Sequence, residues 1–426
     1  MKLNLFYFWF IKLTMDIFDR IENNPGPLGE YATYADGEYI FPQLEGEIST
    51  KMFFKGQEMI VFSLNNYLGL ANHPEVRKVD AESGQSYGLA YPMGSRAMTG
   101  QTKHHQELEK ELADFTQKES SLLLNFGYQG MFSLIDTLLT RNDVVVYDSE
   151  SHACAIDGIK LHRGKRFVFA HNDMGSFEKS LQKASKITAE TGGGILVLTE
   201  GVFSMNGEQG KLKEIVELKK KYPFRLIVDD AHGLGVMGEN GVGTGEEQGV
   251  QDKIDLYFST FTKSFAGFGA FVSGKASVIK YIKYNIRSQI FANALPIVMV
   301  IGIRKRLELV KQNPQFRTRL WENVFKIQKG LRDLGFDIGK TNTCITPVFI
   351  KADTLEATLI VKELREVHGI FTSIVVYPVI PKGLVMLRII PTAEHSDEEI
   401  NQLLLAFESL NKPKEKQPIL INNEFV

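Results

Sequence analysis

From about residue 56 to about residue 300, short β-rich runs alternate with amphipathic stretches. The runs are 121–124, 144–147, 167–170, 195–198, 225–228, 256–261 and 270–273, and the helical patterns between them are 105–115, 131–139, 176–189 and 212–222. Strands that alternate with helices predict an α/β fold with a mostly parallel sheet flanked by helices. Ligands of such folds bind at the carboxyl ends of the strands, so polar residues just past each run are candidate site residues.

The pattern changes after about residue 300. A long helical stretch at 304–334 is followed by strands at 345–350, 371–376 and 385–390 and by helices at 355–367 and 398–410, the last of which opens with a capping box at Ser396 and Glu399. We therefore predict four parts. They are an N-terminal helix and irregular arm (1–60), a large domain (61–300), a smaller C-terminal α+β domain (301–412) and a polar tail (413–426).

Charge and cysteine content narrow the class of protein. The formal charge of -2 and the pI near 6.5 argue against a nucleic-acid binder. Cys154 and Cys344 give neither a disulfide framework nor a metal-ligand spacing, and we expect a cytoplasmic protein with no metal site. The apolar run Leu5 to Ile11 is too short to span a bilayer. Either Met15 is the true start, or the run makes a peripheral contact with the inner membrane.

Lys263 and Asp229 are the first candidate site residues. Lys263 stands just past the run 256–261, between hydroxyl residues and ahead of Gly267 and Gly269. A desolvated lysine on such a turn suits a Schiff base, and glycines let the backbone approach a flat ring. Asp229 ends the run 225–228 and could hold the protonated nitrogen of a pyridine ring, which would make that ring an electron sink. Either residue alone is more often an ordinary surface group; together they point to pyridoxal phosphate.

Other strand ends carry further candidates. His152 could lie flat on a cofactor ring and exchange protons with a carbonyl, and His232 could donate to a phenolic oxygen. Gly127 and Tyr128 begin the helix after 121–124, where backbone N–H groups make an anion site, and Thr260 adds a hydroxyl suited to the same phosphate.

A last group suits a substrate carboxylate. Ser204 follows the run 195–198 and could hydrogen-bond either the cofactor or the substrate, Arg388 offers a planar fork, and Asn65 could assist it. For Arg388 alone, a surface salt bridge is the alternative. The segment from Gly233 to Gly238 matches the dinucleotide fingerprint Gly-x-Gly-x-x-Gly, but the residues after it are a poor helix start, so we reject a nucleotide site there.

These motifs resemble the α-oxoamine synthases, which are fold-type I pyridoxal-phosphate enzymes of the class II aminotransferase-like group. The matching landmarks, which span residues 16–410 in family order, are Asn65 to Gly69, Gly94 to Arg96, Thr99-Gly100, His105 to Glu109, Ser151 to Ala153, Ile156 to Gly158, Gly201 to Met205, Val228 to His232, Thr260 to Lys263, and Arg388. The family includes serine palmitoyltransferase, 2-amino-3-ketobutyrate coenzyme A ligase, 8-amino-7-oxononanoate synthase and 5-aminolevulinate synthase.

The resemblance implies a role for each matching residue. Lys263 would hold pyridoxal 5′-phosphate and shuttle the Cα proton, and Asp229, His232 and His152 would contact the ring nitrogen, the phenolic oxygen and the ring face. The implied phosphate ligands are Gly127, Tyr128 and Thr260, and the implied carboxylate ligands are Asn65, Ser204 and Arg388. The resemblance also implies a homodimer with the active site between its subunits. The implied substrates are a small amino acid and an acyl thioester of coenzyme A or of acyl carrier protein.

Departures from the family pattern bear on the substrate. Ala292 stands where relatives often place a hydroxyl that reaches the neighbour's phosphate, and Ala97-Met98-Thr99 differs from the Phe-Leu-Asn of bacterial serine palmitoyltransferases. The loop 377–383 looks closer to the ketobutyrate ligase. The arm and the stretch 265–270 resemble the Bacteroidota branch associated with sphingoid bases and their sulfonate analogues, which arise when cysteate replaces serine.

We therefore expect a decarboxylative acyltransferase that joins serine or cysteate to a fatty acyl thioester and yields a 3-keto long-chain amine. Arg96 is our candidate partner for a sulfonate, with a structural ion pair as the alternative. Glycine C-acetyltransferase or 8-amino-7-oxononanoate synthase activity is the second reading. Two readings from other classes are an NAD-dependent oxidoreductase, which would rest on Gly233 to Gly238, and an inactive paralogue in a lipid-synthesis complex, which the intact set around Lys263 argues against.

Overall fold

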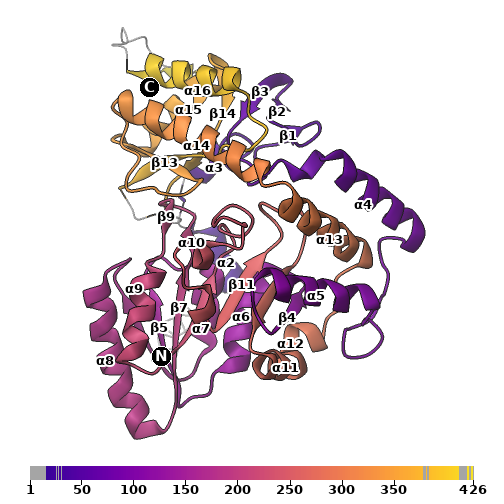
Figure 1. The fold of residues 1–426 in the computed structure, drawn as a ribbon. Helices are drawn as coiled ribbons and strands as arrows, with labels where there is room; N and C mark the ends of the chain where they lie inside the picture. The colour runs from indigo at the N-terminus through magenta and orange to yellow at the C-terminus, as the bar shows by residue number, and fades with distance from the viewer. Residues whose placement is uncertain are drawn as a thin grey trace, which may run out of the picture.

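The computed structural model describes residues 16–24, 26, 28–29, 31–377, 380, 383–411, 420–421 and 424–425. The apolar run at 5–11 and most of the predicted polar tail lie outside the described residues. A large α/β unit and a smaller unit stacked on it make up the body of the molecule (Figure 1). Within the described ranges, no helix is long and apolar enough to cross a membrane.

A seven-stranded sheet forms the centre of the large unit, in the order β4-β12-β11-β10-β7-β5-β6. Its strands are β4 (Ser120–Leu124), β5 (Val144–Asp148), β6 (Lys165–Phe169), β7 (Ile195–Glu200), β10 (Arg225–Asp229), β11 (Leu256–Thr260) and β12 (Ala270–Gly274). Only β12 runs antiparallel to its neighbours, so β4 points the same way as the other five. The predicted α/β class is confirmed, and each predicted run of the large domain is a strand of this sheet.

Helices cover both faces of the sheet. They are α4 (Pro74–Tyr87), α5 (Lys103–Phe115), α6 (Gly127–Leu138), α7 (Ala153–Leu161), α8 (Met174–Thr191), α9 (Leu212–Glu217), α10 (Thr244–Glu247), α11 (Ala276–Asn285), α12 (Arg287–Ile290) and α13 (Ile297–Gln312). Strand side chains alternate between two cores, as β5 shows: Val144 and Val146 pack in the cluster with α5 and α8, and Val145 packs in the cluster with α6 and α7. Because both faces are buried, the carboxyl edge of the sheet is where polar groups gather.

The single long helix predicted at 304–334 is wrong. The chain forms two helices, α13 and α14 (Gln315–Asp333), which are separated at Asn313 and Pro314. Proline has no N–H to donate and disfavours helical backbone in the residue before it, and Asn313 accordingly adopts φ -123° and ψ 71°. Moreover, α13 begins at Ile297, seven residues before the predicted start.

The irregular arm predicted up to residue 60 is also wrong, because it contains the strands β1 (Leu44–Glu45), β2 (Lys51–Phe54) and β3 (Gln57–Val61). Lys55 and Gly56 both have positive φ, 51° and 76°, as a two-residue hairpin turn requires. β3 then pairs in parallel with β14 (Ile370–Phe371), so the arm joins the small unit. The domain limits themselves stay a prediction.

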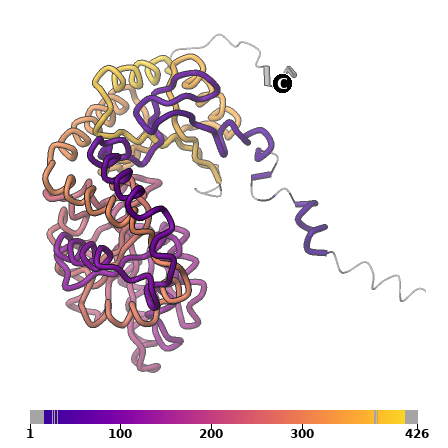
Figure 2. Tube along the Cα trace, turned by 90° about the vertical axis from the view of Figure 1, so that its right-hand side faces the viewer, coloured from indigo at the N-terminus to yellow at the C-terminus, as the bar shows by residue number. Residues whose placement is uncertain are grey.

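A second sheet, in the order β13-β16-β15, forms the centre of the small unit. Its strands are β13 (Thr346–Ile350), β15 (Ser373–Val375) and β16 (Val385–Ile389), and its helices are α3 (Tyr31–Ala35), α14, α15 (Thr354–Glu366) and α16 (Asp397–Leu410). The strand predicted at 371–376 is interrupted at Thr372, because β14 and β15 join different sheets. The predicted capping box between Ser396 and Glu399 is present. Helix α2 (Ile17–Glu22) lies apart from the body (Figure 2) and has no buried residue.

Candidate active site

Three neighbouring parallel strands end together at the carboxyl edge of the large sheet. β7 ends at Glu200, β10 at Asp229 and β11 at Thr260, and in the strand register Asp229 lies beside both Glu200 and Phe258. Lys263 follows Thr260 by three residues. The structure thus brings Lys263 and Asp229 to one edge, as the sequence predicted.

Lys263 sits on a tight turn that holds its amine at this edge. The Lys263 carbonyl accepts the N–H of Ala266 at 2.8 Å, and the Phe261 carbonyl accepts the N–H of Gly267 at 2.8 Å. Burial lowers the pKa of the Lys263 amine, while the nearby carboxylate of Asp229 opposes that shift. A lysine with a lowered pKa is more readily deprotonated, as a nucleophile or a base must be.

Asp229 and Asp230 are adjacent but differ in what they can contact. Asp230 is fully enclosed and accepts hydrogen bonds from the Thr244 N–H (2.7 Å), the Thr244 hydroxyl (2.9 Å) and the Tyr257 hydroxyl (3.2 Å). Among the described residues, the carboxylate of Asp229 accepts only the N–H of Ala231, on Oδ1 at 3.1 Å, and its Oδ2 accepts nothing. Burial raises the pKa of Asp229, and Lys263 opposes the shift. Asp229 is therefore the carboxyl group that is open to a ligand.

Glu200 belongs to this cluster, although our sequence analysis assigned it no role. Its Oε1 accepts the backbone N–H of His152 at 2.5 Å. Burial holds the pKa of Glu200 well above its ordinary value, and the carboxylate of Asp229 adds to that shift. Its position at the end of β7 was the available sequence indication. A position at the end of a strand does not show that the acid there is buried beside Asp229.

His152 caps the amino terminus of α7 with its own ring. Nδ1 accepts the Cys154 N–H at 3.3 Å and lies 3.0 Å from the Cys154 sulfur. A nitrogen that accepts cannot carry the proton, so the neutral ring is protonated on Nε2. Burial lowers the pKa of His152, and the amine of Lys263 contributes in the same direction. The ring of Tyr128 packs edge-on against it, with centroids 6.1 Å apart.

A polar network links the large sheet to the small unit. Nδ1 of His232 lies 2.7 Å from the Tyr67 hydroxyl, and burial holds the pKa of His232 well below its ordinary value. Arg388, on β16, donates from Nε to the carbonyl of Ser204 at 3.0 Å and from Nη2 to Oδ1 of Asn65 at 3.5 Å. The positive charge of Arg388 also contributes to the lowered pKa of Lys263. Sequence analysis did not assign a role to Tyr67, which lies within the quoted motif 65–69.

The start of α6 forms an anion cradle. Among the described residues, no acceptor binds the N–H groups of Gly127, Tyr128 and Gln129. A Cβ atom added at Gly127 would lie 3.3 Å from Cβ and Oγ1 of Thr260, so only glycine leaves this space open. The Tyr128 hydroxyl instead binds Asp157, and the Thr260 hydroxyl donates to the Gly269 carbonyl at 2.9 Å. The cradle is therefore mainly backbone.

Arg96 occupies a different environment. It is buried, its Nη2 lies 2.9 Å from Oε1 of Glu109, and its Nε donates to Gln101 at 2.5 Å. Glu109 also accepts the N–H of Leu123 at 2.9 Å, which ties the pair to β4. Within this chain, Arg96 forms the structural ion pair that we weighed as the alternative and makes no contact with Arg388.

The glycines from Gly233 to Gly238 form turns. Gly235 and Gly238 have φ of 82° and 81°, and no helix opens at these glycines. The next helix, α10, begins at Thr244 and has four residues. A dinucleotide fingerprint needs a helix amino terminus at its glycines, and these glycines lack that context.

The comparisons with known proteins agree with this geometry. The family model for aminotransferase class I and II matches residues 57–407. The chain belongs to this family. It is 60% identical over 400 residues to the cysteate-C-fatty acyltransferase of Capnocytophaga ochracea, with 94% of this chain and 95% of the relative covered. It is 34% identical to the serine palmitoyltransferase of Sphingobacterium spiritivorum, with 85% and 89% covered.

Solved structures show the same fold. The serine palmitoyltransferase of Sphingomonas wittichii superposes with a TM-score of 0.85 at 29% identity, over 93% of this chain and 98% of that one. The S. paucimobilis enzyme with a bound PLP–myriocin aldimine gives 0.85 at 27% identity, with the same coverage. The predicted resemblance to α-oxoamine synthases and fold-type I pyridoxal-phosphate enzymes is confirmed.

Proposed function

We propose that this enzyme, a pyridoxal-phosphate-dependent acyltransferase, condenses cysteate with a fatty acyl thioester, releases CO2 and yields a 3-keto long-chain amine that carries a sulfonate. The observation that carries the proposal is the placement of Lys263 beside Asp229 on the sheet edge with Arg388 reaching in from β16. The relative that is 60% identical over nearly the full chain favours cysteate over serine.

The site fits pyridoxal phosphate on three independent features. The N–H groups at the start of α6 suit a phosphate, and the absent Cβ of Gly127 leaves room for it beside Thr260. The open Oδ2 of Asp229 suits a protonated ring nitrogen, and the amine of Lys263 has the lowered pKa that a nucleophile needs. When bound there, the cofactor supplies an electron sink next to the amino acid's Cα.

Each side chain of the site would then have its own role. The guanidinium of Arg388 would bind the substrate carboxylate, with Asn65 beside it. Holding the carboxylate there would determine which Cα bond stands perpendicular to the ring. Lys263 removes the Cα proton. Asp229 keeps the ring nitrogen protonated. His152, whose proton is on Nε2, would lie against the bound cofactor and would hydrogen-bond a carbonyl oxygen as charge develops on it.

A spectral titration tests the amino acid. Cysteate, serine, glycine and alanine are added separately to the holoenzyme, and the cofactor absorbance is followed without any acyl thioester. We expect cysteate to saturate the change at the lowest concentration. Saturation by serine with no response to cysteate would place the enzyme with serine palmitoyltransferases, and a preference for glycine or alanine would favour the acetyltransferase or oxononanoate synthase reading.

We also infer a homodimer, because a band of exposed apolar side chains borders the site. It comprises Leu89, Tyr91, Met93, Met98, Phe126, Phe268 and Phe291. Hydrogen bonds tie its segments together: Ala294 N–H to Gly94 O at 2.8 Å, and the Asn125 side chain to Asn293 O at 2.5 Å. Phe126 precedes the anion cradle and Phe268 follows Lys263, so this band and the site share one rim. Exposed patches of this kind mark protein interfaces.

Light scattering after size-exclusion chromatography tests the dimer. Met98→Glu together with Phe291→Glu should shift the particle toward the mass of one chain, because two charges would be buried at the interface. Leu405→Glu, on the exposed face of α16, is the control and should leave the mass unchanged. A wild-type protein of one-chain mass would contradict the inference directly.

A further inference from the structure

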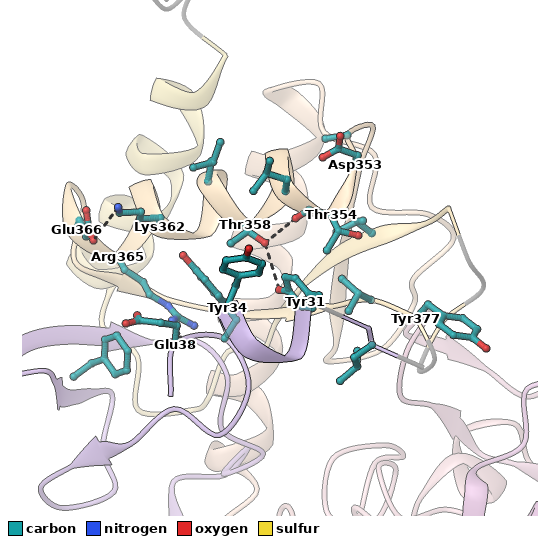
Figure 3. Close-up of a pocket in the computed structure, with 18 of the residues that line it drawn as sticks. Tyr31, Tyr34, Glu38, Asp353, Thr354, Thr358, Lys362, Arg365, Glu366 and Tyr377 are labelled. Atoms are coloured by element: carbon teal, nitrogen blue, oxygen red, sulfur yellow. Dashed lines mark hydrogen bonds and ion pairs between the residues drawn. The ribbon is translucent and has the colours of Figure 1, made fainter. Parts of the chain in front are cut away.

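A second cavity lies on the small unit, away from the carboxyl edge of the large sheet (Figure 3). Its volume is about 1150 Å³, and its walls come from α3, the turn between β2 and β3, α15 and the ends of β15 and β16. None of the residues that we place in the active site lines it. The cavity is therefore a separate feature that the proposed reaction does not use.

Large apolar side chains that line the cavity are open to solvent. Tyr34, Leu355, Tyr377 and Leu384 are all exposed lining residues, although each comes from a different segment. Tyr31 also lines it and is held in place by a 3.3 Å hydrogen bond from its hydroxyl to Thr358. A wall of this composition and extent is typical of a site for an apolar ligand.

Arg365 places a buried cation in the same cavity. The residue is 4% exposed, and it donates from Nη1 to the Glu38 carbonyl (2.5 Å) and from Nη2 to the Thr372 carbonyl (3.2 Å). Its Nε has no partner among the residues that the structure describes. The guanidinium lies 4.0 Å from the centre of the Phe371 ring. Burial lowers the pKa of Arg365 to about 10, so it stays charged at neutral pH.

No carboxylate in the described part of the chain forms an ion pair with Arg365. The two acids that line the cavity near it pair elsewhere: Glu38 with Lys55, and Glu366 with Lys362 at 3.9 Å. A buried charge without a counterion is costly unless something compensates it. The ring contacts and two carbonyls compensate in part, but the buried Nε has no acceptor among the described residues, so the charge of Arg365 is not fully compensated within the described chain.

Most of the ionisable side chains that line the cavity lie at one end of it. In Figure 3, Arg365, Glu38, Lys362 and Glu366 gather at that end, and Tyr377 stands at the other, on the same side as the acid Asp353. This polarity matches a molecule that has an anionic head and a long apolar tail.

We propose that this cavity binds a single-chain anionic lipid, with a carboxylate or sulfonate at Arg365 and the alkyl chain along the wall toward Tyr377. Two kinds of molecule have this chemistry: a free fatty acid and the sulfonated long-chain product. Only the product as ligand rests on the proposed function; the lipid site itself does not rest on it.

Occupancy of the cavity should be felt at the active site. Arg388 pairs with Ser373 in the β15–β16 hairpin, and the cavity residues Tyr377 and Leu384 lie just beyond its last pair, Val375 with Met386. At roughly 3.3 Å per residue along a strand, Leu384 is about 13 Å from Arg388. A ligand that contacts Tyr377 and Leu384 should therefore change amino-acid affinity, and the reverse must hold equally.

The test is calorimetric titration of the holoenzyme with dodecanoate, dodecanesulfonate and dodecanol below their micelle concentrations. We expect both anions to bind at least about tenfold more tightly than the alcohol, since only they can accept from the guanidinium. Tighter dodecanesulfonate would favour the product as the source, and tighter dodecanoate the free fatty acid. Equal affinity for the alcohol would overturn the anionic head, and no binding by any of the three would overturn the site.

A matched pair of variants locates the binding. Leu355 lines the cavity and is 49% exposed, whereas Leu405 lies on α16 and is 64% exposed. Because both leucines are on the surface, neither Leu355→Asp nor Leu405→Asp should unfold the chain. Leu355→Asp should weaken dodecanoate at least about tenfold by placing a charge against the alkyl chain. Leu405→Asp should leave the affinity unchanged. Equal affinity in both variants would overturn the location, and Leu359→Trp, which fills the cavity, checks it independently.

Competition separates this site from the acyl substrate. Long-chain acyl thioester should not displace dodecanoate from the enzyme. Displacement by palmitoyl but not by butyryl thioester would assign the cavity to the substrate's own chain and overturn a separate lipid site. Because the cysteate titration uses no acyl group, its failure would reject the proposed function and leave dodecanoate binding unaffected.

Discussion

The carboxyl edge of the large sheet and the cavity on the small unit use buried charge in opposite ways. At the sheet edge, Lys263, Asp229, Glu200 and His152 shift one another's pKa values, so each group is poised to gain or lose a proton. In the cavity, the buried cation Arg365 is held by carbonyl oxygens and rings, and it stays charged. Mutually perturbed titratable groups indicate chemistry, whereas an isolated guanidinium indicates binding.

The largest effect is expected at the carboxyl edge of the large sheet, where we place the reaction. Lys263→Ala should abolish turnover, because it removes the only amine in the cluster, and borohydride should no longer fix the cofactor to the chain. Thermal unfolding and dodecanoate affinity should stay near wild type, since the cavity is separate. Normal condensation by this variant would remove Lys263 from the mechanism.

Asp229→Asn should lower kcat by at least about 10²-fold, since a neutral amide cannot hold the ring nitrogen protonated. The cofactor should still bind through the cradle at α6. Asp230→Asn is the contrasting variant: Asp230 is saturated by Thr244 and Tyr257, so its loss should appear first in the free energy of unfolding. Near-normal turnover of Asp229→Asn would show that Asp229 faces another group.

Arg388→Lys tests the carboxylate-binding residue that the small unit contributes to the active site. Lysine keeps the charge but lacks the fork, so we expect amino-acid affinity to fall by about 1.5–3 kcal/mol, or roughly 10- to 150-fold. The spectral titration with cysteate measures it directly. If acyl-thioester KM rose instead while amino-acid affinity held, Arg388 would belong to the other substrate.

The strand pattern predicted which edge of the sheet carries the candidate site residues. Asp229 and Glu200 end strands, and His152, His232 and Lys263 follow strands, whose carboxyl ends meet at that edge. The roles of Tyr67 and Glu200 were not predictable in this way, because they depend on which atoms face each other across elements distant in sequence: Tyr67 on His232, and Glu200 on the backbone of His152.

The fold was less predictable outside the large sheet. The alternation that marks parallel strands is a strong local pattern, whereas the arm's strands are short and owe their place to pairing with β14, more than 300 residues later. Pro314 was readable as a helix break and was missed. The ion pair of Arg96 with Glu109 depended on the packing of α5 and could not be distinguished from a ligand contact by sequence.

Glu200→Gln should reveal the coupling at the sheet edge as a pH effect. The folded-state pKa of Glu200 is raised, so its contribution to the free energy of unfolding is present at low pH and is lost as pH rises through the folded pKa. Glutamine, which never ionises, should match wild type at acid pH and become relatively more stable as pH increases. Thermal unfolding across pH measures this, and parallel curves would show that Glu200 does not titrate.

The smallest effect concerns how His152 is held. Cys154 contacts its Nδ1 through both the backbone N–H and the sulfur, and only the second contact can be mutated. Cys154→Ser keeps a side-chain donor to Nδ1 of His152 and should retain kcat. Cys154→Val removes that donor and should lower kcat by no more than about tenfold, which is the contribution of one hydrogen bond. The acid limb of the pH–rate profile should move to higher pH in the valine variant, because Nδ1 is then freer to take a proton. A valine variant with an unchanged rate and profile would mean that the backbone N–H of Cys154 alone fixes the tautomer of His152.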